Sequence, residues 1–195
     1  MRRPTRAFAL AAIAMTLSAC GAVNATVGSD KGDAAGRTAT PLVVSAARDS
    51  LSRPSPATRM VCSAEIHHDV ATLLGLPGTP RSSTTWANHV YRCTYHLAQG
   101  PLVVSVSEAR DVSTARRYFA ELRSRLANTH LIHGADALGL PAFEAAAGSV
   151  TFLKDASTLQ VDATQLPDHV GENSRGRTDL AYTLATDILG CWSGN

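Results

Sequence analysis

Seven histidines are the residues of this 195-residue chain that first suggest a metal site. His67 and His68 are adjacent, so on a helix their side chains would point about 100° apart and could not bind one ion together. His89 and His96 are seven residues apart, which places them on opposite faces of a strand. The chain contains neither H-E-x-x-H nor C-x-x-C, the spacings typical of zinc sites. The sequence therefore predicts no metal site, and His67, His68 and Asp69 form the best remaining cluster.

Motifs that position a catalytic nucleophile or a phosphate group are also absent from the sequence. It contains no G-x-S-x-G, no G-x-x-x-x-G-K-[ST] and no G-x-G-x-x-G. Glu108 and Asp111 follow a predicted strand closely, but carboxylates at the start of a helix are typical of capping. We therefore expect no enzymatic activity and no cofactor. An envelope hydrolase is the least favoured alternative, and a buried contact between histidine and serine or Cys191 would argue for it.

The first twenty residues predict export from the cytoplasm. MRRPTR contains three arginines and no acid, and the ten residues AFALAAIAMT that follow carry no charge, as in a secretory signal. This apolar run is shorter than the about 20 residues that span a bilayer. An ordinary signal-peptidase cut would leave Cys20 as a simple thiol. Leu17-Ser18-Ala19-Cys20, followed by Gly21, instead resembles the lipobox of bacterial lipoproteins. That resemblance implies that residues 1–19 are removed and that Cys20 is acylated, with a palmitate-type anchor.

The composition separates a predicted stalk from a predicted domain. Residues 20–58 are rich in Gly, Ala, Ser, Thr and Pro and predict a flexible, lipid-anchored stalk. Residues 59–195 predict one globular domain of ordinary size. The formal net charge of +2 includes Arg2, Arg3 and Arg6, and without these three the chain has 15 basic against 16 acidic residues. With no basic cluster that includes aromatic residues, we expect no nucleic-acid partner.

Hydrophobic periodicity predicts an α+β domain, an antiparallel sheet of about five strands packed against two or three helices on one face. A first helix would begin after Ser63 as N-cap, and a second after Asp111 or Ser113. The last helix would span about Arg177 to Cys191. The predicted strands are residues 86–97, 102–107, 142–146, 150–154 and 158–164.

The predicted domain contains Cys62, Cys93 and Cys191, so at most one disulfide can form within it. In an exported protein such a disulfide is expected, and three pairings are open. Cys62–Cys93 is favoured because Cys93 shares a strand face with Tyr91 and Tyr95, and this face should receive the start of the first helix. The disulfide would contribute about 3–4 kcal/mol in the chain-entropy model. Cys191 would then be a free thiol.

The lipobox, the stalk and the cysteines at positions 62 and 93 together resemble small actinobacterial cell-envelope lipoproteins of unknown function. The segment GADALGLPAFE at 134–144, the hairpin after it and the amphipathic final helix extend the resemblance. It implies that Cys62 and Cys93 form the usual cysteine pair of the family, in which Cys191 has no counterpart. It implies no activity.

These observations favour a protein held by Cys20 on the extracytoplasmic face of the cell membrane. We expect a binding or accessory module for an envelope protein partner, such as a transporter or sensor. The alternative is a carrier of a lipid or other apolar ligand between the sheet and the helices, in a space lined by Ala142, Ala145–Ala147 and Gly148. A ligand-sized apolar cavity would distinguish the carrier from the module.

Overall fold

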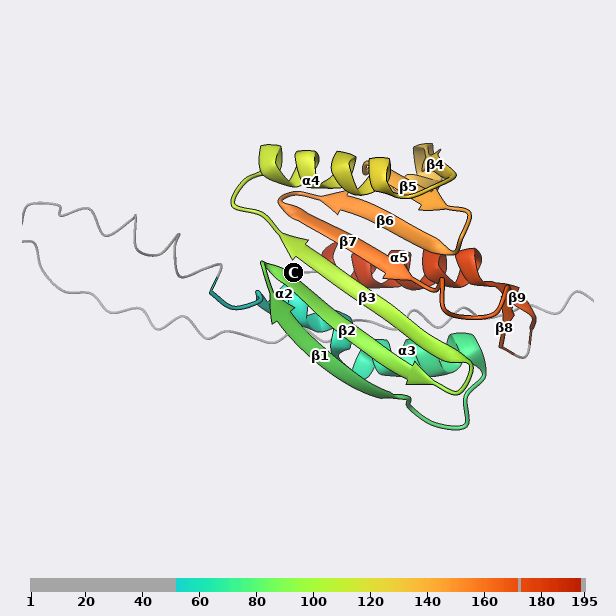
Figure 1. The fold of residues 1–195 in the computed structure, drawn as a ribbon. Coiled ribbons are helices and arrows are strands. Elements are labelled where there is room, and N and C mark those ends of the chain that lie inside the picture. The colour runs from blue at the N-terminus through green and yellow to red at the C-terminus, as the bar shows by residue number, and fades with distance from the viewer. Residues whose placement is uncertain (1–51, 172, 194–195) are drawn as a thin grey trace, which may run out of the picture.

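The structure is a computed structural model that describes residues 52–171 and 173–193. The predicted signal peptide, Cys20 and most of the predicted stalk lie outside the described residues. The described chain forms one seven-stranded antiparallel sheet in the order β1-β2-β3-β7-β6-β5-β4, as Figure 1 shows. Its strands are β1 (Arg81–Ala87), β2 (Val90–Leu97), β3 (Gly100–Glu108), β4 (Thr129–Ile132), β5 (Ala142–Ala145), β6 (Ser149–Lys154) and β7 (Ser157–Asp162). The prediction of an α+β domain with an antiparallel sheet is confirmed.

The helical elements and a second, small sheet account for the rest of the fold. The helices are α2 (Pro56–Arg59), α3 (Ala64–Leu74), α4 (Val112–Arg125) and α5 (Arg177–Ser193), and two 3-10 turns, η1 (Met60–Cys62) and η2 (Gly134–Ala137), accompany them. Ser63 caps α3 as predicted, because its side chain accepts a hydrogen bond from the Ile66 N–H. Asp111 caps α4 in the same way through the Thr114 N–H. The predicted loop before α5 contains a two-stranded sheet of β8 (His169–Val170) and β9 (Arg175–Gly176).

The sheet has two strands more than the about five expected from the sequence. Residues 86–97 were expected as a single strand, but Asn88 and His89 have φ values of 51° and 61° and form the turn of the β1–β2 hairpin. β1 is rich in Ser and Thr and lacks the apolar alternation that predicts a strand. β4 is only four residues long and pairs with β5 at one edge.

Helices cover both faces of the sheet, whereas the sequence predicted cover on one face. On the inner face, α3 and α5 bury the main core, which includes Tyr95, Phe152 and Leu159. On the outer face, α4 packs Ala115 and Phe119 against Phe143 of β5 and against Leu153 of β6. Figure 1 shows α4 apart from α3 and α5, which lie behind the strands. Because α4 lies on the β5–β7 side, no described helix covers the outer face of β1–β3.

The folded region begins before residue 59, where the stalk was predicted to end. Thr58 is 1% exposed, and its hydroxyl donates a hydrogen bond to the Glu108 carboxylate at the end of β3. The Ser55 N–H donates to the same carboxylate, and Trp86 Nε1 donates to the Ser52 carbonyl. These contacts hold residues 52–58 against the domain. Those from Ser55 and Thr58 satisfy a buried carboxylate, which composition alone did not indicate.

Candidate functional site

A disulfide joins Cys62 at the end of η1 to Cys93 in β2, with 5.6 Å between the Cα atoms. Cys93 is fully buried on the inner face beside Tyr95, and Cys62 precedes the N-cap of α3. The strand alternation and the Ser63 cap therefore bring the two sulfur atoms together. The disulfide favoured from the sequence is present.

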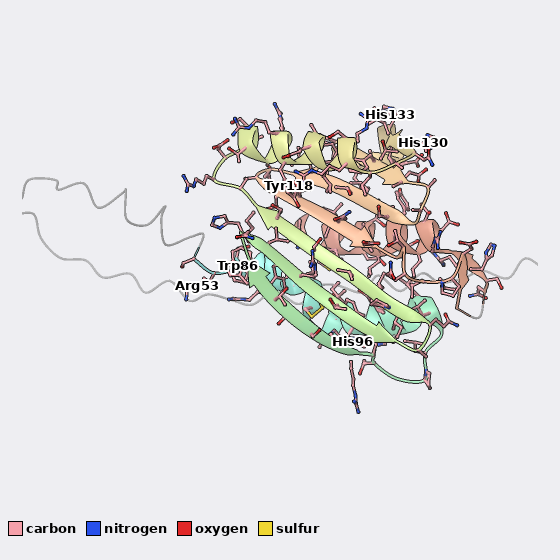
Figure 2. All side chains as sticks on the ribbon, viewed as in Figure 1. Arg53, Trp86, His96, Tyr118, His130 and His133 are labelled. Carbon is pink, nitrogen blue, oxygen red and sulfur yellow. A yellow bond between two sulfur atoms is a disulfide. The ribbon has the colours of Figure 1, made fainter. Side chains whose placement is uncertain are left out.

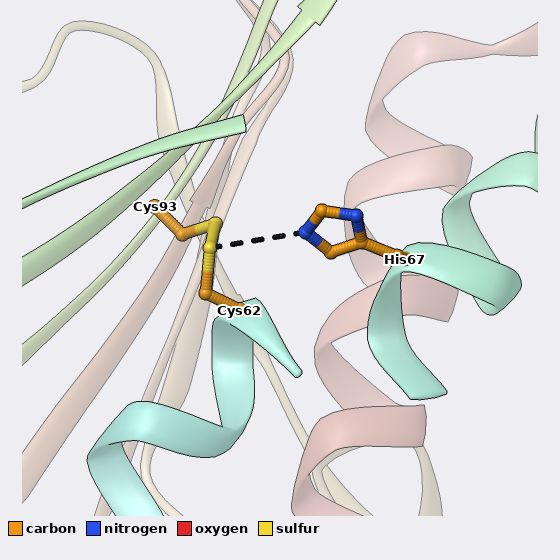
Figure 3. Close-up of side chains that lie close together, drawn as sticks. All are labelled: Cys62, His67 and Cys93. Atoms are coloured by element: carbon orange, nitrogen blue, oxygen red, sulfur yellow. Dashed lines mark hydrogen bonds between the residues drawn. A yellow bond between two sulfur atoms is a disulfide. The ribbon is translucent and has the colours of Figure 1, made fainter. Parts of the chain in front are cut away.

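His67 lies beside this disulfide, as Figure 3 shows. Its Nε2 is 4.0 Å from Cys62 Sγ and 3.0 Å from the Ser82 hydroxyl of β1. The His67 ring meets the ring of Tyr95 edge-on at 5.0 Å between centroids. The Tyr95 hydroxyl donates to the Val61 carbonyl, and burial raises the pKa of Tyr95. This surrounding fixes the His67 ring at the disulfide.

The cluster of Cys62, His67 and Cys93 has donor atoms close enough to hold a metal ion. Both sulfur atoms are joined in the disulfide, however, and metal binding requires thiolates. In the oxidised protein only His67 is left as a strong ligand. His68 and Asp69, the other members of the cluster considered from the sequence, are not part of this group.

The contact of Ser82 with His67 is the kind of pair that would argue for a hydrolase. A serine nucleophile also needs its histidine oriented by a third group. Among residues 52–171 and 173–193, no carboxylate forms a hydrogen bond with the other ring nitrogen of His67. Ser82 and His67 therefore contact each other beside the disulfide, and the described residues do not complete a catalytic arrangement around them.

Cys191 takes no part in the disulfide and is buried in the last turn of α5. Its thiol donates a long hydrogen bond to Glu65 of α3, at 3.8 Å, and so joins the two inner helices. Asp69 and Asp187 lie nearby on the same helices. Burial, and then the negative charge of a neighbouring carboxylate, raises the pKa of each of these two aspartates.

Buried apolar side chains occupy the described region between the sheet and the inner helices, where an apolar ligand was considered. Ala142 and Ala145 are buried in the core, while Ala146 and Ala147 lie exposed in the following turn. A Cβ atom added to Gly148 would meet the Arg177 side chain at 2.6 Å, so no spare volume exists there. An apolar hollow between Leu74, Leu97 and Leu166 has a volume of about 110 Å³. Ligand pockets typically measure about 300 Å³ or more.

The edge of the sheet at β4 has a different surface. Three large apolar side chains of the described chain are exposed, and two of them belong to this region. Leu131, 44% exposed, is part of β4, and Leu138, 50% exposed, follows η2, whose residues line a hollow together with Leu131. Leu131 lies on β4, opposite Phe143 of β5. Leu138 ends η2 with a φ of 54°, a left-handed conformation that is costly for a bulky side chain. The fold thus presents Leu138 to solvent at a cost in backbone energy.

Two hollows adjoin this edge and share Leu131, Ile132 and His133. One has a volume of about 290 Å³ and is mainly apolar, with η2 and Leu140 in its wall. The other has a volume of about 400 Å³ and reaches Asp136, Glu144 and Tyr182. Tyr182 of α5 fixes η2, because its hydroxyl donates to the Asp136 carbonyl at 2.7 Å. We call Leu131, Leu138 and these two hollows the β4 edge site. Figure 2 labels His130 and His133 at this edge.

Comparisons with protein-family models, curated proteins and solved structures gave no match for this chain. In the described part of the chain, no helix has the length and apolar composition of a membrane span. Sequence reasoning singled out the segment 134–144, which forms η2 and β5, but it did not identify Leu131 or Leu138 as surface residues. An apolar residue in a sequence is normally assigned to the core, and only the tertiary structure shows these two to be exposed.

Proposed function

We propose that this protein is a lipid-anchored binding or accessory module of the cell envelope that contacts a protein partner through the β4 edge site. The observation that supports this proposal most is the pair of exposed leucines beside an edge strand. Exposed apolar groups next to polar ones are typical of protein-interaction surfaces.

The β4 edge site offers two kinds of contact to a protein. Among the strands that the structure describes, β4 pairs only with β5, so a partner can add a strand along its other edge through main-chain hydrogen bonds. Leu131 and Leu138 can be buried against apolar side chains of that partner. The hollow beside Leu140 can receive one of the partner's side chains. Hot spots of binding energy usually lie in such pockets.

The opposite edge strand of the described sheet, β1, also has a free edge, but it carries no exposed leucine. β1 has the sequence RSSTTWA, and most of its side chains are exposed and polar. Polar, charged edges discourage strand pairing between molecules. We therefore assign partner binding to β4 and not to β1.

Quantitative co-isolation tests the proposal with the full acylated protein from its own host. Leu131→Asp/Leu138→Asp should lower the yield of a specific envelope protein by roughly tenfold or more, because it removes both apolar anchors. Aspartate tolerates the left-handed conformation at position 138 better than leucine does, so the fold should be kept.

Ser83→Asp/Thr85→Asp is the matched control, since it adds two aspartates to exposed positions of β1. It should leave the yield of that envelope protein unchanged. If no envelope protein distinguishes the two double variants, the β4 edge site is not the partner surface.

A further inference from the structure

The end of the domain at which residue 52 lies has basic and apolar side chains that do not belong to the β4 edge site. Figure 2 labels Arg53 and Trp86 together at this end. Trp86 Nε1 donates a hydrogen bond of 3.2 Å to the Ser52 carbonyl, and Glu108 accepts hydrogen bonds from Ser55 and Thr58. Everything upstream of residue 52, including the predicted anchor Cys20, is therefore joined to the domain at this end.

A cavity of about 420 Å³ opens at the same end, between the β1–β2 hairpin and the start of α4. Its wall includes Asn88, His89, Arg110, Arg117 and Tyr118. Both arginines are exposed, and Arg117 contacts the Thr114 hydroxyl at 3.2 Å. Guanidinium groups are well suited to phosphate, with which they form paired hydrogen bonds.

Two acidic residues near the cavity already have hydrogen-bond partners. Glu108, in the wall of the cavity, is 9% exposed and accepts hydrogen bonds from the N-terminal segment. Asp111 accepts from Ser113 and Thr114, and these hydrogen bonds lower its pKa to about 2. Both carboxylates therefore accept hydrogen bonds from donors of the protein itself. Arg53 and Arg59 add two exposed positive charges to this end of the domain.

An exposed apolar side chain lies next to these charges. Val112, the first residue of α4, is 43% exposed and is the third large apolar side chain that the described chain presents to solvent. Trp86 is half-buried at the same end. Basic residues around an apolar side chain and a tryptophan are typical of protein surfaces that rest on a lipid headgroup layer.

From this arrangement we propose that the anchor end of the domain binds the anionic phospholipid surface to which the chain is tethered. Arg110 and Arg117 take a headgroup phosphate into the cavity, while Val112 contacts the boundary between headgroups and acyl chains. The contact orients the domain so that the β4 edge site lies at a fixed angle to the membrane. The assignment does not depend on which protein binds β4.

Vesicle flotation tests the proposal with the chain from residue 20 onward carrying Cys20→Ser, so that no acyl chain contributes to binding. This chain should float with vesicles of equimolar phosphatidylglycerol and phosphatidylcholine, and binding should fall as salt is added. It should not float with phosphatidylcholine alone. Arg110→Gln/Arg117→Gln should weaken binding to the anionic vesicles roughly 20- to 30-fold, the effect expected for two basic groups at a membrane surface.

Arg81→Gln/Arg123→Gln is the matched control, because it removes the same charge from positions outside the cavity wall. It should weaken binding by roughly threefold or less, as a long-range charge effect. Equal losses for the two double variants, or equal flotation with neutral vesicles, would overturn the proposal. Release of the bound chain by millimolar inorganic phosphate at constant ionic strength would also overturn it, because it would assign the cavity to a soluble anion.

Discussion

The two halves of the sheet are stabilised in different ways. In the half made of β4–β7, β6 is buried on both faces, because α5 covers one face and α4 the other. In the half made of β1–β3, the described helices cover only the inner face, and Arg92 and His96 are exposed on the outer face. This second half has the Cys62–Cys93 disulfide, which fastens the start of α3 to β2. The half that is buried on one face thus has a disulfide, whereas packing on two faces stabilises the other half.

Truncating one side chain on the outer face of each half tests this difference most strongly. Phe143 is fully buried, with its ring 5.0 Å from that of Phe119, and Val103 is half-exposed on the same face of β3. Phe143→Ala should lower the free energy of unfolding by about 3–5 kcal/mol. Val103→Ala should lower it by at most about 1 kcal/mol. Urea unfolding measures both, and equal losses would mean that the two outer faces are equally buried.

Removing the disulfide should have the next largest effect. Cys62→Ala/Cys93→Ala opens a loop with a sequence separation of 31 residues, which should cost about 3–4 kcal/mol. Native-state hydrogen exchange should show that the protection of β1 and β2 falls more than that of β6. Cys191→Ala, which leaves the disulfide intact, serves as the control. Equal loss of protection across the whole sheet would contradict a local role for the disulfide.

The smallest predicted effects concern pH and have opposite signs on the two helical layers. On α5, burial and the charge of Asp69 raise the pKa of Asp187, so its ionised form destabilises the folded state at neutral pH. Asp187→Asn should therefore raise the melting temperature slightly at pH 7. This gain should disappear as the pH falls through the raised pKa toward about 4, because the wild-type carboxyl is then protonated.

On α4, hydrogen bonds from Ser113 and Thr114 lower the pKa of Asp111 to about 2, so its ionised form stabilises the folded state. Asp111→Ala should lower the melting temperature at pH 7. The difference from the wild type should shrink as the pH falls from about 4 toward 2. Thermal unfolding across this pH range measures both variants, and changes of the same sign would contradict the assignment.

Local patterns in the sequence were sufficient to predict how β2 and α3 meet on the inner face of the sheet. The alternation through Cys93 and Tyr95 and the cap at Ser63 placed the two cysteines of the disulfide together, because both signals act over a few residues. β1 was missed because its serines and threonines give no apolar alternation, as is common for an exposed edge strand. The helix α4 was predicted, but its place on the outer face was missed. Its apolar stripe packs on Phe143, and periodicity cannot tell which face of the sheet a helix covers.

The candidate sites were harder to predict than the fold. Leu131 and Leu138 are ordinary apolar residues in the sequence, and their exposure follows from where β4 ends the sheet and from the left-handed backbone at Leu138. Arg110 and Arg117 line a cavity only because α4 starts beside the β1–β2 turn, whose Asn88 and His89 form the other wall. Both surfaces depend on the tertiary arrangement of segments that show no functional motif.

Site-specific photo-crosslinking in the native cell envelope distinguishes partner binding at β4 from partner binding at β1. A photoreactive phenylalanine analogue is placed at Leu131 in one variant and at Thr85, on the opposite edge, in the other. We expect a discrete crosslinked protein adduct from position 131 and none from position 85. An adduct from position 85 alone, or none from either position, would contradict the assignment of partner binding to the β4 edge site.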